Sequence, residues 1–209
     1  MAIHVLHVRK SGGTAIHAAL GPIAEQFSLR LHNHNTRACD VPGEPVAFSL
    51  RHPVSRFVSG FESRRRMGAP RYNIPWSPGE KRAYGKFRTA NDLAEALDGG
   101  PLQHDAWAAM SAIPHLALPL RNWITLDDLH RRKNIVWIGI QETLNDDFKR
   151  LCATLGLPAH VQLPTDLVAA HRAPEAPEPI SERARANIMA WYAEDVAIYD
   201  HARQMALTL

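Results

Sequence analysis

The chain has 209 residues, of which 45% are hydrophobic, so it can bury one full core and needs no second domain. Its formal net charge of +3 favours an anionic ligand, although charge alone does not separate a nucleotide from a polysaccharide, a nucleic acid or a membrane surface. Two cysteines argue against a disulfide framework, and no apolar run has the length of a signal peptide or of a membrane-spanning helix. We therefore expect one domain over residues 1–209, soluble and cytoplasmic.

The first third of the chain has the clearest pattern. Short apolar runs predict strands at residues 3–8, 27–31 and 46–50. Helical periodicity follows the first strand from Thr14 and the third from Pro53, a residue type that the first turn of a helix tolerates. Strands that alternate with helices are typical of parallel sheets with crossover helices. The sequence thus predicts an α/β fold with a central parallel sheet flanked by helices.

The middle of the chain is less regular. Glycines, prolines and aromatic residues between positions 67 and 78 predict an ordered loop rather than a linker. Helical spacing of apolar residues predicts two helices, at 90–97 and 105–112. No internal repeat or low-complexity tract interrupts the chain.

The last third returns to a strand followed by helices. Residues 134–138 predict a buried strand, and the helix after it is expected to stop at Gly156, because glycine commonly ends helices. Residues 168–179 are rich in proline and predict an irregular segment. A last helix is expected to start at Ser181, a good N-cap residue, and to continue through Ile198.

The junction between the first strand and the first helix has the residues of a phosphate-binding loop. It reads His7-Val8-Arg9-Lys10-Ser11-Gly12-Gly13-Thr14. Paired glycines allow backbone N–H groups to approach a phosphate closely, and the start of a helix adds a favourable dipole. Lys10 precedes the glycines, whereas the ATPase loop places its lysine after them. An exposed Gly-Gly turn would be the simpler interpretation of this segment alone.

A second basic junction favours the phosphate interpretation. Leu50-Arg51-His52-Pro53-Val54-Ser55-Arg56-Phe57-Val58-Ser59-Gly60 also passes from a strand into a helix. A guanidinium binds phosphate through paired hydrogen bonds, and a serine two turns into the helix can face the same space. Two such junctions predict one ligand with a phosphate at each end.

With these two motifs, the chain resembles the PAPS-dependent sulfotransferases, in particular the carbohydrate-type, family 2-like group and its bacterial relatives. PAPS is 3′-phosphoadenosine 5′-phosphosulfate. The resemblance implies a P-loop-like three-layer domain. His52 departs from the pattern, because the family usually has aspartate there. Weaker likenesses are Ile138-Gly139-Ile140-Gln141-Glu142 and the pattern Tyr192…Asp195…Tyr199.

The resemblance also implies a role for each matched residue. Lys10 is expected to contact the oxygen that bridges phosphate and sulfate, and Arg51 and Ser59 to bind the 3′-phosphate. The residues expected around the 5′-phosphosulfate are Arg9, Lys10, Ser11, Gly12, Gly13 and Thr14. PAPS would be a co-substrate, and this chemistry requires no metal.

Transfer of a sulfuryl group to a hydroxyl needs a base that takes the proton of the acceptor. We predict His32 or His34 for this role, because both follow the second predicted strand and ligands of parallel sheets bind at the carboxyl ends of strands. The sequence does not decide between the two. Two alternating histidines lack the further ligands of a zinc site, so we expect no metal here.

The acceptor is expected to be a glycan or another small molecule with a hydroxyl group. Candidate acceptor-binding residues are Arg56, Arg71, Tyr72 and Trp76, since cations attract acidic sugars and aromatic rings stack on sugar rings. Arg56 has an equally good interpretation as a salt-bridged helix residue. The segment Ala170-His171-Arg172-Ala173-Pro174 is a candidate lid over the nucleotide.

Two other classes stay open at this point. A P-loop nucleotide kinase would hydrolyse or transfer from ATP with magnesium, and a non-catalytic protein would bind a nucleotide or polyanion without turnover. No motif that reads DNA or RNA is present, so we expect no nucleic-acid partner. The identity of the acceptor and the oligomeric state are beyond the sequence.

Overall fold

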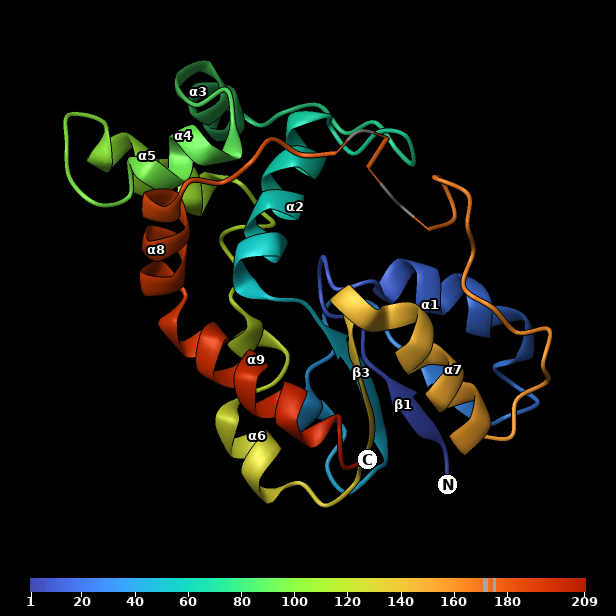
Figure 1. The fold of residues 1–209 in the computed structure, drawn as a ribbon. Helices are drawn as coiled ribbons and strands as arrows, with labels where there is room; N and C mark the ends of the chain where they lie inside the picture. Colours follow the sequence, from blue (N-terminus) through green and yellow to red (C-terminus); the bar gives the residue numbers. More distant parts are fainter. Residues whose placement is uncertain (171–172, 175) are drawn as a thin grey trace.

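The computed structural model describes residues 1–170, 173–174 and 176–209. A four-stranded parallel sheet with the order β2-β1-β3-β4 lies at its centre (Figure 1). The strands are β1 (Ile3–Val5), β2 (Leu29–Leu31), β3 (Val46–Leu50) and β4 (Ile135–Ile140). Every residue of β3 is buried, as expected for a central strand that is covered on both faces. The α/β prediction with a parallel central sheet is confirmed.

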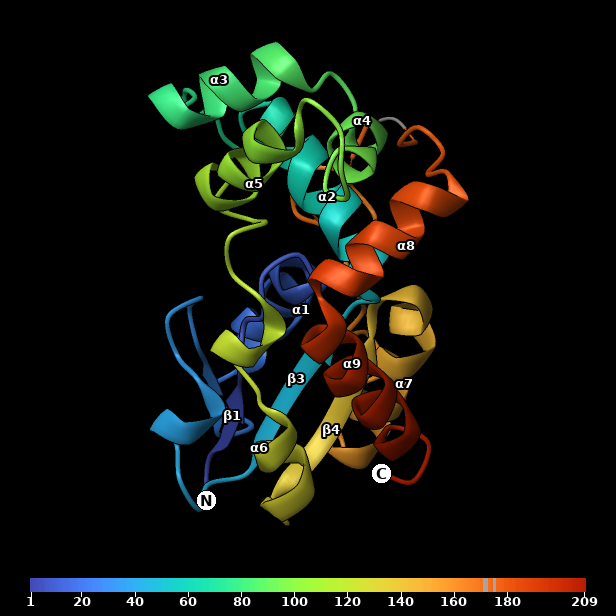
Figure 2. The same cartoon turned by 90° about the vertical axis from the view of Figure 1, so that its left-hand side faces the viewer.

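Helices cover both faces of the sheet. One face packs against α1 (Gly13–Leu20) and α7 (Leu144–Thr154), and the other against α6 (Leu126–Arg131) and α9 (Ala193–Met205) (Figures 1 and 2). The core residues of the first layer include Ile16, Trp137 and Phe148, and those of the second include Phe48 and Ile198. The sheet is therefore the middle layer of three.

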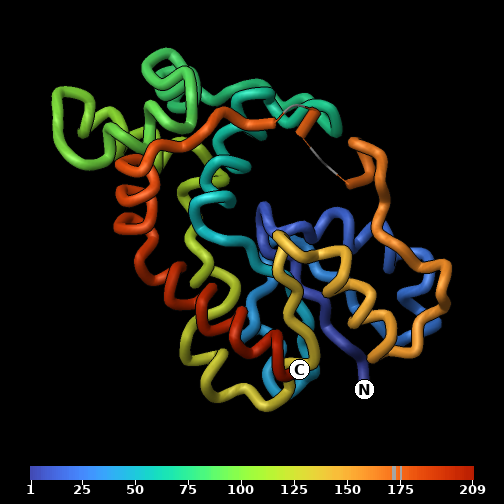
Figure 3. The backbone as a smooth tube through the Cα atoms, viewed as in Figure 1, coloured from blue at the N-terminus to red at the C-terminus, as the bar shows by residue number. Residues whose placement is uncertain are grey.

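A separate group of helices lies beyond the carboxyl ends of the strands (Figures 1 and 3). It consists of α2 (Pro53–Arg65), α3 (Pro78–Lys86), α4 (Ala90–Glu95), α5 (Gln103–Ala112) and α8 (Glu182–Trp191). These helices share a core that includes Phe57, Phe61, Leu93, Met110 and Ile188. Because α2 leaves the end of β3 directly, this helix joins the group to the sheet.

The strand order sets the place of a ligand site. From β1 the chain moves to β2 on one side of it, and then returns to β3 on its other side. The carboxyl ends of β1 and β3 are thus adjacent, with Val5 opposite Ala47 in the register. In open parallel sheets, such a reversal opens a crevice between the two loops that leave the strands.

Some helices differ from the sequence predictions. The last predicted helix is two helices, because the backbone leaves the helical region at Tyr192 (φ −108°, ψ 36°). Two short helices, α3 and α6, were not predicted. Ser77 and Thr125 begin them through reciprocal capping with Glu80 and Asp128, a local signal that outweighs the weak apolar pattern.

Among the residues that the structure describes, four short 3₁₀ turns complete the fold, at Gly21–Ile23, Ala38–Asp40, Leu120–Asn122 and Gln141–Thr143. Within the part of the chain that the structure describes, none of the helices combines the length and apolar character needed to cross a membrane.

Candidate functional site

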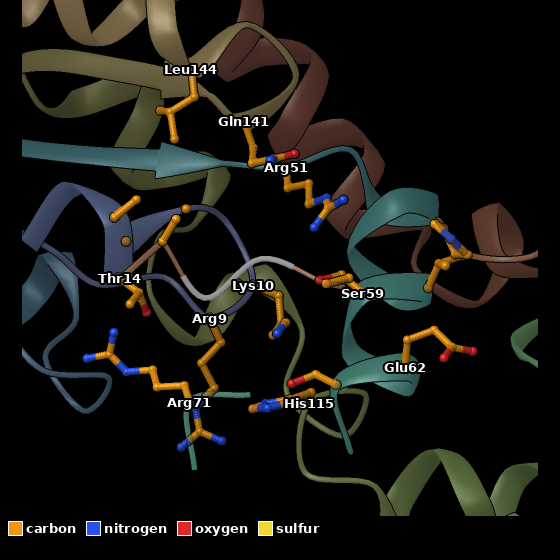
Figure 4. A pocket seen from close by; sticks show the side chains of 18 of the residues that line it. Arg9, Lys10, Thr14, Arg51, Ser59, Glu62, Arg71, His115, Gln141 and Leu144 are labelled. Carbon is orange, nitrogen blue, oxygen red and sulfur yellow. The ribbon is translucent and has the colours of Figure 1, made fainter. Parts of the chain in front are cut away.

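A cavity of about 850 Å³ lies between the carboxyl ends of the strands and the group of helices around α2. Its walls come from the loops after β1, β3 and β4, from α2, and from segments near residues 71, 88, 115, 163, 170, 173–174 and 176–178. Figure 4 shows Lys10, Arg51 and Ser59 directed into the same space. The two basic junctions of the sequence therefore meet at one cavity.

The loop after β1 has an unusual backbone. Lys10 has a φ of 63° and Gly12 a φ of 90°, both in the left-handed region. For lysine this conformation is uncommon and costs free energy, and such residues are frequent at binding sites. Ser49 holds the loop from β3, since its hydroxyl donates a hydrogen bond of 2.6 Å to the carbonyl of Ser11. Ser11 itself is fully buried, so the structure places its side chain beneath the loop rather than in the cavity.

The two glycines leave room for neighbours that pack against the loop. A Cβ atom at Gly13 would lie 2.2 Å from the ring of His7, and one at Gly12 would lie 2.5 Å from Leu144. The N–H groups of Gly13 and Thr14, at the start of α1, have no hydrogen-bond partner among the described residues. They are available to an anion at the cavity wall, where the helix dipole also favours negative charge.

Lys10 lines the cavity without a hydrogen-bond or ion-pair partner among the described residues. Burial lowers the pKa of Lys10 from 10.5 to about 7, with further lowering by the positive charges of Arg51 and Arg66. A cation in this setting gains most when an anion enters.

Arg51 is held at the opposite side of the cavity. Its Nε donates to the Ser55 hydroxyl (3.1 Å), and that hydroxyl donates to Glu142 (2.7 Å). Burial lowers the pKa of Arg51, and the nearby Glu142 carboxylate opposes this effect. Tyr199 donates a further hydrogen bond to Glu142 (3.3 Å), so the chain from Tyr199 to Arg51 orients the guanidinium.

The resemblance leads us to expect aspartate at position 52, where this chain has histidine. The structure shows which group the His52 side chain contacts. Its ring Nδ1 accepts a hydrogen bond from the N–H of Val54 (3.2 Å), so the imidazole caps the start of α2. A carboxylate commonly satisfies this helix donor. The imidazole of His52 therefore fills the capping role that an aspartate would fill, and it lies directly after Arg51 in the chain.

Arg56 lies outside the cavity and is almost fully buried, with 2% of its surface exposed. Its guanidinium donates to the carbonyls of Arg9 (3.2 Å) and Leu118 (2.6 Å), and it forms an ion pair with Asp195 at 3.4 Å. Of the two interpretations of this residue, the structure fits the salt-bridged helix residue, because the guanidinium is buried outside the cavity and each of its three nitrogens already has a partner.

The two predicted catalytic histidines are in different places. His34 lines the cavity, where its Nδ1 is 3.1 Å from the carbonyl of His7. His32 does not line it; its Nε2 is 2.8 Å from the Nδ1 of His4, with the two rings stacked. Residues two apart share a face only within a strand. Because β2 ends at Leu31 and a turn follows at residues 34–35, His32 and His34 do not share one side.

His7 also lines the cavity, packed between the rings of His17 and His34 at centroid distances of 4.5 and 3.9 Å. Burial lowers the pKa of His7 to about 3, with further contributions from these two imidazoles. The sequence motif contains His7 as its first residue, but the spacing alone does not show that its ring covers Gly13.

His115 is a cavity residue that the sequence analysis missed. It follows α5 in a loop without a motif, so no sequence signal marks it. Neither of its ring nitrogens has a partner in the part of the chain that is described. Burial and the positive charges of Lys10 and Arg9 together lower the pKa of His115 to about 2.

Arg71 and Tyr72, two of the candidate acceptor-binding residues, line the cavity, and Arg71 also donates to the carbonyls of Val168 and Ala169. Trp76 does not line it. Its indole N–H donates to the Arg64 carbonyl (2.7 Å) and its ring stacks on Tyr84, so it belongs to the helical core.

Ala170, Ala173 and Pro174, from the predicted lid, contribute to the wall, whereas His171 and Arg172 lie outside the described residues. Among the described residues, no three histidine, cysteine or acidic side chains are grouped so that they could hold a metal ion. Comparisons of the chain with protein-family models, with curated proteins and with solved structures found no match.

Proposed function

We propose that this protein is a PAPS-dependent sulfotransferase with a P-loop-like three-layer domain, which transfers a sulfuryl group to a hydroxyl, most plausibly of a carbohydrate. One observation supports this above all: Lys10 and Arg51, from loops at two adjacent strands, share one cavity. A nucleotide with phosphates at both ends suits such a pair of cations. The cavity volume of about 850 Å³ is within the range of roughly 300–1,000 Å³ that is usual for small-molecule sites.

In this proposal, the amides of Gly13 and Thr14 bind the 5′-phosphate, and Arg51 and Ser59 bind the 3′-phosphate. Arg9 lies beside Lys10 on the same wall, with its Nε buried and unpartnered in the described part of the chain. Lys10 stabilises the negative charge that grows on the bridging oxygen as the sulfuryl group leaves, which is charge stabilisation by a preorganised cation.

Binding of adenosine 3′,5′-bisphosphate, measured by calorimetry, is the first test. We expect Arg51→Ala to weaken this binding by roughly 10- to 100-fold, since a charged hydrogen-bonding partner contributes about 1.5–3 kcal/mol. Adenosine 5′-phosphate, which lacks the 3′-phosphate, should bind equally to both proteins. Arg131→Ala is the matched control, because Arg131 is exposed on α6, where it pairs with Asp127.

Measurement of turnover distinguishes a sulfotransferase from a nucleotide kinase and from a non-catalytic binding protein. Labelled PAPS and a set of glycans should yield adenosine 3′,5′-bisphosphate, and Lys10→Ala should slow its release. ADP formation from ATP with magnesium would instead identify a nucleotide kinase. Binding of the bisphosphate without any transfer would identify a non-catalytic nucleotide-binding protein.

A further inference from the structure

One wall of the cavity contains buried polar atoms without hydrogen-bond partners among the described residues, and the proposed binding of PAPS by the loops after β1 and β3 does not account for them. Ser63, Arg66 and His115 all line it, and each has buried polar atoms without a hydrogen-bond partner in the described part of the chain: Oγ, Nε and both ring nitrogens. A buried polar atom without a hydrogen-bond partner is unfavourable, because it has lost its contacts with water and gained none in exchange. Three such residues at one cavity point to a ligand that supplies the missing partners.

Ser63 and Arg66 lie at the end of α2, where Ser63 is one helical turn beyond Ser59, and His115 lines the same cavity. Ser59 and Ser63 are four residues apart on α2 and so share a face of the helix. Between them, Gly60 packs against the loop of His115, since a Cβ there would lie 3.1 Å from the Cβ of His115. His115 and Lys10 line the same cavity (Figure 4), and the charge of Lys10 acts on the imidazole.

The loop of His115 is held in place from three sides. Tyr192 donates to the Leu116 carbonyl (2.7 Å), Arg56 donates to the Leu118 carbonyl (2.6 Å), and the carboxylate of Asp195 accepts from the Leu120 N–H (2.8 Å). Arg56 also binds the carbonyl of Arg9, so one buried guanidinium joins this loop to the loop of Lys10. Such support is what a preorganised site requires.

We propose that Ser63, Arg66 and His115 form the acceptor subsite, and that His115 takes the proton of the acceptor hydroxyl. This inference rests on the proposed function. The acceptor oxygen forms a bond to sulfur while the bond from sulfur to the bridging phosphate oxygen breaks, with its electron pair retained by the phosphate. The hydroxyl proton moves to the free ring nitrogen of His115 and then to water. The products are a sulfate ester and adenosine 3′,5′-bisphosphate.

The charges around His115 make the pKa of its imidazole depend on whether PAPS is bound. Burial is the largest cause of the lowered pKa of His115. Four neighbouring groups lower it as well: Lys10, Arg9, Arg64 and His34. Bound PAPS is anionic and offsets the effect of Lys10 and Arg9, so the imidazole becomes a stronger base when the donor is present. The subsite also selects the acceptor. One terminal nitrogen of Arg66 pairs with Glu62 at 3.5 Å, and its Nε has no partner among the described residues. That free donor favours a polyol that carries a carboxylate or sulfate beside its hydroxyl.

The catalytic test measures release of adenosine 3′,5′-bisphosphate from PAPS, with water and with glucuronic acid as acceptors. His115→Gln should lower kcat by at least 100-fold, because a general base contributes roughly 10²- to 10⁴-fold. Added imidazole should restore part of the rate of His115→Ala, an effect that a structural role does not produce. His104→Gln, at an exposed position on α5, is the control and should keep the wild-type rate.

The binding test uses saturation-transfer NMR in the presence of saturating adenosine 3′,5′-bisphosphate. Glucuronic acid should bind more tightly than glucose, and Arg66→Met and Ser63→Ala should remove that difference. Ser111→Ala, in an exposed serine of α5, should leave it unchanged.

The outcomes separate the two proposals. If the wild-type protein does not bind the bisphosphate, the proposed function is overturned. If it binds normally but His115→Gln keeps full turnover, or imidazole rescues nothing, only the assignment of His115 is overturned. Weaker bisphosphate binding in the Ser63 and Arg66 variants would assign those residues to the donor instead and overturn the subsite.

Discussion

The guanidinium of Arg56 donates a hydrogen bond of 3.2 Å to the main-chain carbonyl of Arg9, the residue before Lys10. Arg56 is buried and pairs with Asp195 from α9. Through these contacts the first helix after β3, the loop after β1 and the last helix are tied together behind the cavity. The arginine that the sequence offered as a sugar ligand instead supports the loop that would hold the phosphates.

Replacing Arg56 by methionine should lower the free energy of unfolding by about 3–5 kcal/mol, since it leaves the buried carboxylate of Asp195 unpaired. Urea denaturation measures this change. Arg121→Ala is the matched control, because the ion pair of Arg121 with Glu194 is exposed and such pairs contribute about 1 kcal/mol or less. Equal effects of the two substitutions would contradict the role given to Arg56.

Binding of adenosine 3′,5′-bisphosphate should take up a proton at pH 8 and almost none at pH 6. The pKa of Lys10 in the empty cavity is about 7, so the amine is largely neutral at pH 8, and an anion raises its pKa and protonates it. The affinity should therefore fall as the pH rises above about 7. Calorimetry in buffers with different ionisation enthalpies measures the uptake, and a Lys10→Met variant that shows the same uptake would refute this origin.

Gly13→Ala should destabilise the protein by about 1–3 kcal/mol and weaken bisphosphate binding at least tenfold, because the new methyl group would meet the ring of His7 at 2.2 Å. Gly85 lies within α3, where an added methyl group would meet open space. Gly85→Ala should instead stabilise the protein by about 0.5–1 kcal/mol, because alanine favours a helix more than glycine does. Thermal unfolding and calorimetry compare the two. A Gly13→Ala protein with normal affinity would show that the start of α1 does not touch the ligand.

His52→Ala should cost about 0.5–2 kcal/mol of stability, the usual effect of removing an N-cap side chain. His52→Asn should recover most of that loss, since the amide oxygen can accept the same hydrogen bond from Val54. Chemical denaturation of the three proteins measures both steps. Equal stability of the alanine and asparagine variants would exclude a capping role for His52.

Acid should destabilise the histidine cluster around α1. The pKa values of His7 and His17 are lowered to about 3 and 4 by burial and by neighbouring imidazoles, whereas the unfolded chain has the ordinary value of 6.5. Between pH 6.5 and 4 the unfolded state binds more protons, so the free energy of unfolding falls as the pH falls. His17→Leu should make this fall smaller, and His104→Leu, at an exposed site, is the control. An unchanged pH profile in His17→Leu would rule out this explanation.

Local patterns in the sequence determined much of what the structure contains. The strand at Val46–Leu50 and the helix from Pro53 lie where apolar periodicity and proline predicted them. Gly12 adopts the positive φ that a phosphate loop uses, and the Lys10 and Arg51 loops both lie at the carboxyl edge of the sheet. These features depend on residues that are neighbours in the chain or on the direction of a strand, and the local sequence determines both.

Other features depend on contacts between residues that are far apart in the chain, and only the tertiary structure decided them. Packing against the Arg9 and Leu118 carbonyls buries Arg56, and stacking on His4 keeps His32 away from the cavity. His115 reaches the cavity because α5 belongs to the same helical core as α2 and the loop after it passes Gly60. No local signal marks these positions, since the burial and hydrogen bonding of a side chain are set by whichever segments the fold brings against it.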